Sequence, residues 1–314
     1  MRRWDAVVEG YLDEVRARGV AETRRQQVQR ELDRWGSWMR HRRPRPVLEQ
    51  IGSDLLLQYL RVRTRFRSKA TVSGVMSVLR GMGDYLVRQR LWASNPLRWM
   101  RGPKRDWRTH LPRRIPGAAL QQLWEAASKG REGYHRWLWI TVLSVLYGTG
   151  LRRGELERLN LGDWNREEGL LQVDGRKTGR PRQLPLPELV WRCLESYLPQ
   201  RQNQLEKLGR TQETALFVNK LGGRLKGRSI SVAVHALARR GHVGRVTLHQ
   251  FRHTCASDLL ESGVRLPEVQ RILGHETIST TMRYLHVADP QRHEAVKGHP
   301  INDILNEELG HEER

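Results

Sequence analysis

The sequence contains little cysteine and no long apolar run. Its 314 residues include two cysteines, Cys193 and Cys255, whose separation matches no metal-binding or redox motif. With no disulfide framework, a reducing cytoplasm is the expected compartment. The longest apolar stretch, residues 137–148, is too short to span a bilayer, and residues 1–10 lack the apolar core of a signal peptide. We therefore expect no membrane partner.

Acidic residues are scarce relative to basic ones. The chain has 34 Asp and Glu against 56 Lys and Arg, which gives a formal net charge of +22. The basic residues recur along the chain and are not confined to a tail. A charge of this size favours a polyanionic partner, with DNA or RNA as the default. The alternative is a basic surface that serves only solubility, although solubility alone requires a smaller net charge.

Hydrophobic periodicity indicates a mainly α fold with a small β-sheet, and it begins with a helical domain over residues 1–102. One of its helical faces consists of Val28, Leu32, Trp35 and Met39. Residues 103–117 follow and are rich in proline and basic side chains, a composition that predicts a linker. A domain on each side of a cationic linker predicts a two-domain clamp around a duplex.

The second predicted domain covers residues 118–298 and contains helices and a β-hairpin. Residues 170–173 and 183–186 indicate two short strands that are joined by a basic turn. Residues 299–314 form a separate amphipathic segment, which predicts a short tail helix. A helix of this length is not stable alone, so it packs either on its own domain or on a neighbouring molecule.

The segment "TLHQFRHTCASDLLESG" predicts a helix whose first turns carry cationic side chains. Thr247 and Gln250 have the spacing of a capping box. His249, Arg252 and His253 lie off the apolar stripe, which consists of Leu248, Phe251, Cys255 and Leu259. Helix N-termini attract anions, so these groups form either an anion site or a solvated cationic cap.

Two further segments place basic side chains next to turns. In "YGTGLRRGEL", Arg152 follows a glycine turn, and Glu155 is one helical turn later, where it is able to hold a guanidinium group. In "DGRKTGRPR", the turn projects Lys177, a residue type that can donate a proton in a groove. The alternatives are a surface ion pair at the first segment and a solvated turn at the second.

Tyr284 is one of seven tyrosines and lies in "RILGHETISTTMRYLHV". His275 follows Gly274, which is expected to end a helix. In the next short helix, Ile278 and Met282 mark an apolar face, and Tyr284 falls about 120° from its middle at helical spacing. The pattern therefore predicts a tyrosine outside the apolar face.

These groups favour phosphodiester chemistry that uses neither a metal nor another cofactor. Metal-assisted hydrolysis requires a compact set of ligands. His249 and His253 have i, i+4 spacing, but Gln250 replaces the acid of an HExxH motif. Guanidinium and imidazole groups are able to neutralise the transition state instead. A tyrosine nucleophile would conserve the bond energy in a covalent intermediate, so that strands could be rejoined without ATP.

Four ordered segments resemble the tyrosine recombinase family, which includes phage integrases and Xer-type resolvases. The segments are "TGLRRGEL", "GRKTGRPRQLPL", "LHQFRHT" and "LGHETISTTMRYLHV". The resemblance implies a catalytic domain in the C-terminal part of the chain and a helical core-binding domain before it. The departures are Gln250 and Phe251, where many family members have Asp and Leu.

The resemblance also implies catalytic roles for individual residues. Tyr284 would attack DNA and form a 3′-phosphotyrosyl bond, while Lys177 would protonate the departing 5′ oxygen. Phosphate oxygens would be bound by Arg152, Arg252 and His275. His249 would exchange a proton with the nucleophile. Glu155 would not contact the DNA but would hold a guanidinium group of the site. The family resemblance further implies a tetramer of identical or related recombinases, in which tail 299–314 enters the adjacent protomer.

Other basic residues are expected to contact DNA phosphates, giving affinity more than sequence choice. They are Arg61, Arg63, Arg65, Arg67, Lys69, Lys104, Arg105, Arg176, Arg180, Arg224, Lys226 and Arg228. Two other functions are compatible with a similar set of residues. One is a monomeric type IB topoisomerase, and the other is a DNA-binding or architectural protein without catalysis.

Overall fold

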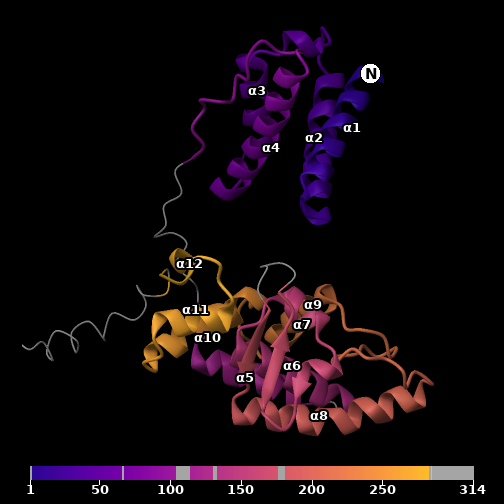
Figure 1. Ribbon diagram of the computed structural model, residues 1–314, viewed down its shortest axis with the longest axis vertical. Helices are drawn as coiled ribbons and strands as arrows, with labels where there is room; N and C mark the ends of the chain where they lie inside the picture. The colour runs from indigo at the N-terminus through magenta and orange to yellow at the C-terminus, as the bar shows by residue number, and fades with distance from the viewer. Residues whose placement is uncertain are drawn as a thin grey trace, which may run out of the picture. The chain divides into compact units, whose positions relative to one another are not determined.

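A computed structural model of the protein describes residues 2–65, 67–103, 114–129, 133–175, 181–282 and 284. The chain divides into two compact units, Met1–Thr109 and His110–Arg314, shown in Figure 1. The division falls within the segment 103–117. Each unit has its own hydrophobic core. Among the described residues, every helix is too short or too polar to cross a bilayer.

The N-terminal unit consists of helices packed around one apolar core. Its elements are α1 (Arg2–Ala17), α2 (Glu22–Arg40), the 3₁₀ turn η1 (Leu48–Gln50), α3 (Ser53–Thr64) and α4 (Lys69–Arg88). The predicted face of α2 is confirmed, since Val28, Leu32, Trp35 and Met39 are all buried. Ser68 caps α4, because its side chain accepts a hydrogen bond from the Thr71 backbone N–H.

The C-terminal unit is also mainly helical. Its helices are α5 (Gly117–Ser128), α6 (Tyr134–Thr149), α7 (Arg153–Arg158), η3 (Leu161–Asp163), α8 (Glu188–Lys207), α9 (Gly227–Arg240), α10 (Leu248–Glu261), α11 (Leu266–Leu273) and α12 (Ile278–Met282). Helix α6 is apolar on most sides and packs against α5, α8 and α10. It is therefore the central helix of this unit, as expected for a helix that is apolar on most faces.

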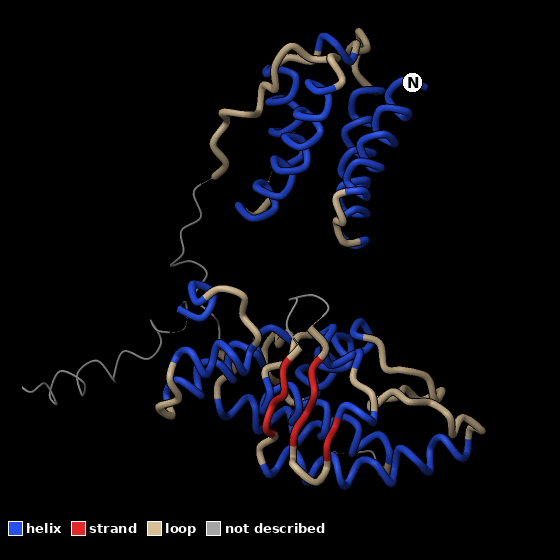
Figure 2. Tube along the Cα trace, viewed as in Figure 1, coloured by secondary structure: helices blue, strands red, loops and turns tan. Residues whose placement is uncertain are grey.

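A small antiparallel sheet completes the C-terminal unit (Figure 2). Its strands are β1 (Trp164–Asn165), β2 (Leu170–Val173) and β3 (Arg182–Pro185), in the order β1-β2-β3. The predicted hairpin pair is confirmed, although β3 begins one residue earlier than 183 and the short β1 was not predicted. In the β2–β3 register, Val173 lies opposite Arg182. The turn that carries Lys177 lies outside the described residues.

Candidate active site

A tight turn after α6 places Arg152 at the start of α7. Gly150 adopts a left-handed conformation with φ of 60°, and a Cβ there would lie 2.6 Å from Leu273. Only glycine therefore lets this turn pack directly on α11. Arg152 then precedes α7, where Glu155 Oε2 accepts from the Arg152 backbone N–H at 2.9 Å and Oε1 accepts from Arg152 Nη1 at 2.9 Å.

Two guanidinium groups meet at the C-terminal end of α11. Arg252 Nη2 donates to the Leu273 carbonyl at 2.6 Å, and Arg252 Nη1 donates to the Gly150 carbonyl at 2.8 Å. Arg152 donates to the Gly274 carbonyl at 2.9 Å and to the Leu273 carbonyl at 3.5 Å. Arg152 and Arg252 therefore converge on one short backbone segment, although their residues are far apart in sequence.

Arg252 is buried, although the sequence pattern placed it off the apolar stripe of its helix. Its exposed fraction is 4%. Burial, followed by the positive charge of Arg152, lowers the pKa of Arg252 to about 10. The guanidinium group remains charged at neutral pH, but its partners are neutral carbonyls. Glu155 offsets this charge in part, and a bound anion would offset it further.

Glu155 is a buried carboxylate that joins two arginines. Arg182 on β3 binds it through Nη1 at 3.2 Å and Nη2 at 3.1 Å, while Arg152 binds it from the position directly before α7. Burial would raise the pKa of Glu155, but the hydrogen bonds and charge of Arg182, together with those of Arg152, lower it below its ordinary value. Glu155 is thus ionised at neutral pH and holds both guanidinium groups.

Arg182 has a structural part in the site that the sequence did not reveal. Besides Glu155, it binds the Ile272 carbonyl through Nε at 2.8 Å, so it ties β3 to both α7 and α11. Arg182 and Leu184 share one face of β3, and Leu184 is buried. Because strand side chains alternate, the apolar residue two positions later was the signal that could have placed Arg182 against the core.

His275 lies directly after the C-terminal end of α11 and is also buried. Gly274 ends the helix in a left-handed conformation, and a Cβ at Gly274 would lie 2.7 Å from Arg182 Nη1. His275 Nδ1 is 2.8 Å from Thr281 Oγ1. Desolvation, followed by the charges of Arg252 and Arg152, lowers the pKa of His275 to about 3. This imidazole is therefore neutral at pH 7.

Tyr284 is buried, and the expectation that it lies outside the apolar face was wrong. Its exposed fraction is 3%, and it belongs to the apolar cluster that contains Leu260, Val269 and Leu273. Ile278 is 48% exposed instead. Helix α12 ends at Met282, so helical spacing cannot be extended to position 284, where the ring packs in this cluster instead.

The Tyr284 hydroxyl contacts a histidine of α10. Its oxygen is 2.7 Å from His253 Nδ1. The Tyr284 ring also stacks on His275, with centroids 6.3 Å apart and an interplanar angle of 3°. Helices α10, α11 and α12, which supply or flank these residues, pack in sequence against one another, as Figure 1 shows.

His249 is exposed, unlike the buried Tyr284 and His275. It lies in the first turn of α10, and its ring centroid is 6.3 Å from that of His253. It lines a cavity of about 470 Å³ together with Arg152 and Arg252. Basic side chains outnumber acidic ones on the other walls, which include Arg153, Arg158, His235 and Arg245 against Glu155 and Glu157. The cavity is therefore basic, which suits a phosphate group.

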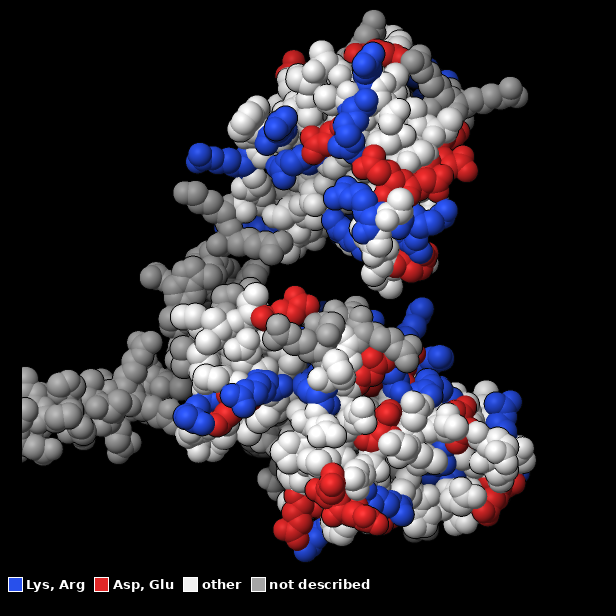
Figure 3. All heavy atoms as spheres, viewed as in Figure 1, with Lys and Arg blue, Asp and Glu red and all other residues white. Residues whose placement is uncertain are grey.

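The proposed DNA contacts outside the site fall into three groups. Six basic side chains are exposed, namely Arg61, Arg65, Arg67, Lys69, Lys226 and Arg228. Four others, Lys104, Arg105, Arg176 and Arg180, lie outside the described residues, as does Lys177. On the face of each unit shown in Figure 3, Lys and Arg are interspersed with Asp and Glu.

Arg63 and Arg224 differ from the expectation, because their side chains are used within the fold. Arg63 donates to Glu31 through Nε and Nη2, both at 2.8 Å. Arg224 donates to the backbone carbonyls of Glu157 and Leu159 at 2.9 and 3.0 Å. Composition alone could not distinguish them from exposed arginines, since their partners are distant in sequence.

Comparisons with known proteins identify the family. The model of the phage integrase family matches residues 113–291. Tyrosine recombinase XerC of Pseudomonas syringae pv. syringae (strain B728a) is 34% identical over 240 residues, which cover 75% of this chain and 77% of the relative. Tyrosine recombinase XerD of Oceanobacillus iheyensis (strain HTE831) is 29% identical over 272 residues, covering 86% of this chain and 89% of the relative.

A solved structure shows the same fold. XerH site-specific recombinase, in a post-cleavage complex with a palindromic difH substrate, superposes with a TM-score of 0.73 at 21% identity. The match covers 91% of this chain and 83% of the XerH chain. The sequence matches and the shared fold lead to one conclusion: this chain belongs to the phage integrase family and is a tyrosine recombinase of the Xer type.

Proposed function

We propose that this chain recombines double-stranded DNA at specific sites by forming a transient covalent bond through Tyr284. One observation carries the assignment to these residues. Leu273 accepts hydrogen bonds from both Arg152 and Arg252 and also packs in the apolar cluster of Tyr284. The proposed nucleophile and the two phosphate-binding groups are thus joined through one residue at the end of α11.

The proposed reaction proceeds in two balanced transfers. The Tyr284 oxygen passes its proton to an imidazole of α10 and bonds to phosphorus as the bond from phosphorus to the 5′ oxygen breaks, and Lys177 supplies the proton of the new 5′-hydroxyl. Arg152 and Arg252 would hold the non-bridging oxygens, whose growing charge they offset. His275, which is neutral at pH 7, would contribute a hydrogen bond. Attack by a 5′-hydroxyl of another strand reverses the chemistry and releases Tyr284.

A nicked suicide substrate tests this proposal, because loss of a short 5′ fragment traps the covalent complex. We expect the wild type to form a protein–DNA adduct that survives denaturing electrophoresis. Tyr284→Phe removes the hydroxyl alone and should bind DNA but form no adduct. The same assay in EDTA tests the expected independence from metal ions. An undiminished adduct with Tyr284→Phe would disprove the role of this residue.

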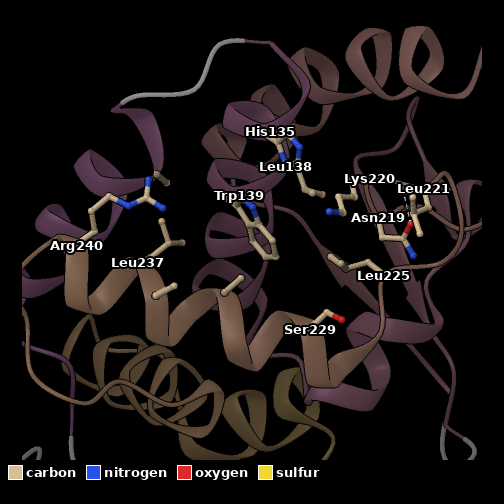
Figure 4. Close-up of a pocket in the computed structure, with 13 residues that line it drawn as sticks. His135, Leu138, Trp139, Asn219, Lys220, Leu221, Leu225, Ser229, Leu237 and Arg240 are labelled. Atoms are coloured by element: carbon tan, nitrogen blue, oxygen red, sulfur yellow. Dashed lines mark hydrogen bonds between the residues drawn. The ribbon is translucent and has the colours of Figure 1, made fainter. Parts of the chain in front are cut away.

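We further propose that copies of this chain assemble on DNA by exchanging tail 299–314, with four protomers in the complete assembly. A hollow of about 430 Å³ between α5, α6, α9 and residues 219–225 is the proposed receptor (Figure 4). Apolar side chains line it, including Leu138, Trp139, Leu225 and Leu237, and Lys220 and Arg240 add positive charge. The tail pairs apolar Ile301, Ile304, Leu305 and Leu309 with acidic Asp303, Glu307 and Glu308, so the two surfaces are complementary.

Matched variants test this assembly. Leu221 lines the hollow and is 65% exposed, whereas Leu189 on α8 does not line it and is 71% exposed. We expect Leu221→Glu and deletion of residues 300–314 to abolish cooperative binding of protomers in gel-shift titrations, while Leu189→Glu retains it. Cooperative assembly by the deletion variant would refute tail exchange. We also propose the cytoplasm as the compartment, since both cysteines are free thiols.

A further inference from the structure

We propose that His253 is an additional catalytic residue and that it, rather than His249, accepts the phenolic proton of Tyr284 during attack. This inference rests on the proposed role of Tyr284 as the nucleophile. The sequence grouped His253 with its neighbours on α10 but gave it no role. In the structure, a ring nitrogen of His253 lies within hydrogen-bonding distance of the Tyr284 oxygen.

The geometry suits direct proton transfer. His253 Nδ1 lies 2.7 Å from the Tyr284 oxygen, within the range expected for a general base and its proton. The two rings are 5.5 Å apart between centroids. When Tyr284 donates this hydrogen bond, Nδ1 is the unprotonated nitrogen and the ring proton is on Nε2. The nucleophile then has the acceptor that its activation requires.

The other two imidazoles of the site are less suited to this step. His275 stacks on the Tyr284 ring, but desolvation and the nearby arginines lower its pKa to about 3, so it is too weak a base near neutral pH. His249 is exposed and lines the basic cavity with Arg152 and Arg252. That position would face a phosphate held by the two arginines, whereas His253 contacts the tyrosine hydroxyl itself.

The charges around His253 determine when the transfer is favourable. Arg252 precedes it on α10, and His275 faces it from the end of α11. Arg152 and Arg182 bind backbone carbonyls at the same end of α11. A protonated His253 would add to this positive charge in the absence of DNA. A phosphate between Arg152 and Arg252 would bring negative charge that stabilises the imidazolium, so substrate binding and proton acceptance favour each other.

The complete step balances. The Tyr284 oxygen bonds to phosphorus and its proton passes to His253 Nδ1. The bond to the 5′ oxygen breaks, and that oxygen takes a proton from Lys177. During rejoining, the attacking 5′-hydroxyl returns its proton to Lys177, and His253 returns its proton to the departing Tyr284 oxygen.

His253→Asn tests the inference, because an Asn amide oxygen can occupy the position of Nδ1 and accept the hydrogen bond but cannot take up a proton. We expect the rate of adduct formation on the suicide substrate to fall about 100-fold, the lower range for loss of a general base. DNA affinity and thermal midpoint should be unchanged. The wild-type rate should rise tenfold per pH unit and level off once the imidazole is unprotonated. In His253→Asn the rate should instead keep rising with pH up to the phenol pKa of about 10 before it levels off.

A substrate with a 5′-bridging sulfur separates the two proton transfers, since a thiolate leaves without a proton from Lys177. We expect His253→Asn to stay about 100-fold slow on this substrate and Lys177→Met to regain activity. The matched change His249→Asn should keep the wild-type pH profile. The inference fails if His253→Asn equals or exceeds the wild-type rate, or if the sulfur substrate rescues it. Failure of wild type to form any adduct would instead reject the proposed function.

Discussion

Each unit contains a buried carboxylate held by arginines, and the two sites differ in how their positive charge is balanced. In the N-terminal unit, Glu31 accepts from Tyr59 at 2.8 Å and from Arg63 through two bonds of 2.8 Å. In the C-terminal unit, Glu155 binds Arg182 and Arg152, but Arg252 adds a further buried guanidinium group whose partners are carbonyls.

This difference distinguishes an ion pair that supports folding from one that prepares a site for an anion. The described donors of Arg63 end on a carboxylate, so its charge is compensated within the protein. The hydrogen bonds of Arg252 end on neutral carbonyls, and burial, followed by the charge of Arg152, lowers its pKa although Glu155 acts in the opposite direction. We infer that Arg252 is poised for a charged ligand, because it lines the basic cavity together with Arg152 and an oxyanion binds guanidinium more strongly than a carbonyl does.

The largest effect should come from removing the arginine that binds each carboxylate through two hydrogen bonds. Arg63→Met and Arg182→Met each leave a carboxylate short of a charge partner, which typically costs about 3–5 kcal/mol in the free energy of unfolding. Their activities should diverge. At saturating DNA and low temperature, Arg182→Met should form the covalent adduct about 100-fold more slowly, because displacement of a catalytic group is costly. Arg63→Met should react at nearly the wild-type rate.

A double variant separates positioning from stability. Glu155→Gln with Arg182→Met removes both charges of the pair, so much of the stability should return. Adduct formation should remain slow, since Arg152 has then lost the carboxylate that holds it. Urea unfolding and the suicide-substrate assay measure the two quantities. If the free energy of unfolding and the rate of adduct formation both recovered, Arg182 would have a role in folding only.

The next effect appears only in acid and concerns the neutral His275. Its folded pKa of about 3 lies below the ordinary value of about 6.5. The unfolded chain therefore binds a proton that the folded site excludes. This contribution to stability is complete above pH 6.5 and is lost as the pH falls toward 3, by up to about 5 kcal/mol. His275→Gln should flatten this part of the curve of unfolding free energy against pH; an unchanged curve would contradict the assignment.

Much of the fold was predictable because local patterns determine it. The capping box at Thr247 is formed, with the Gln250 side chain accepting from the Thr247 backbone N–H at 2.8 Å. The two strands of the hairpin were placed as short runs joined by a basic turn. Periodicity likewise identified the buried face of α2. In each case, the determining residues are within a few positions of one another.

The parts of the site that escaped prediction depend on contacts between distant residues. Burial of Arg252 requires Gly150 and Leu273 as partners, and the link from Arg182 to Glu155 crosses between β3 and α7. Tyr284 follows the end of a short helix, where the chain direction is not given by periodicity. The resemblance to the family named these positions, but only the packed structure brings His253 to the Tyr284 hydroxyl.

The smallest effect should come from the exposed partner of the N-terminal pair. Arg34 also contacts Glu31, at 3.3 Å, but its side chain is 56% exposed, whereas that of Arg63 is 18% exposed. Water screens the exposed interaction, so Arg34→Met should change the free energy of unfolding by less than about 1 kcal/mol. If Arg34→Met instead matched Arg63→Met in urea unfolding, burial would not be what makes an arginine–carboxylate pair important here, and the contrast between Glu31 and Glu155 would lose its physical basis.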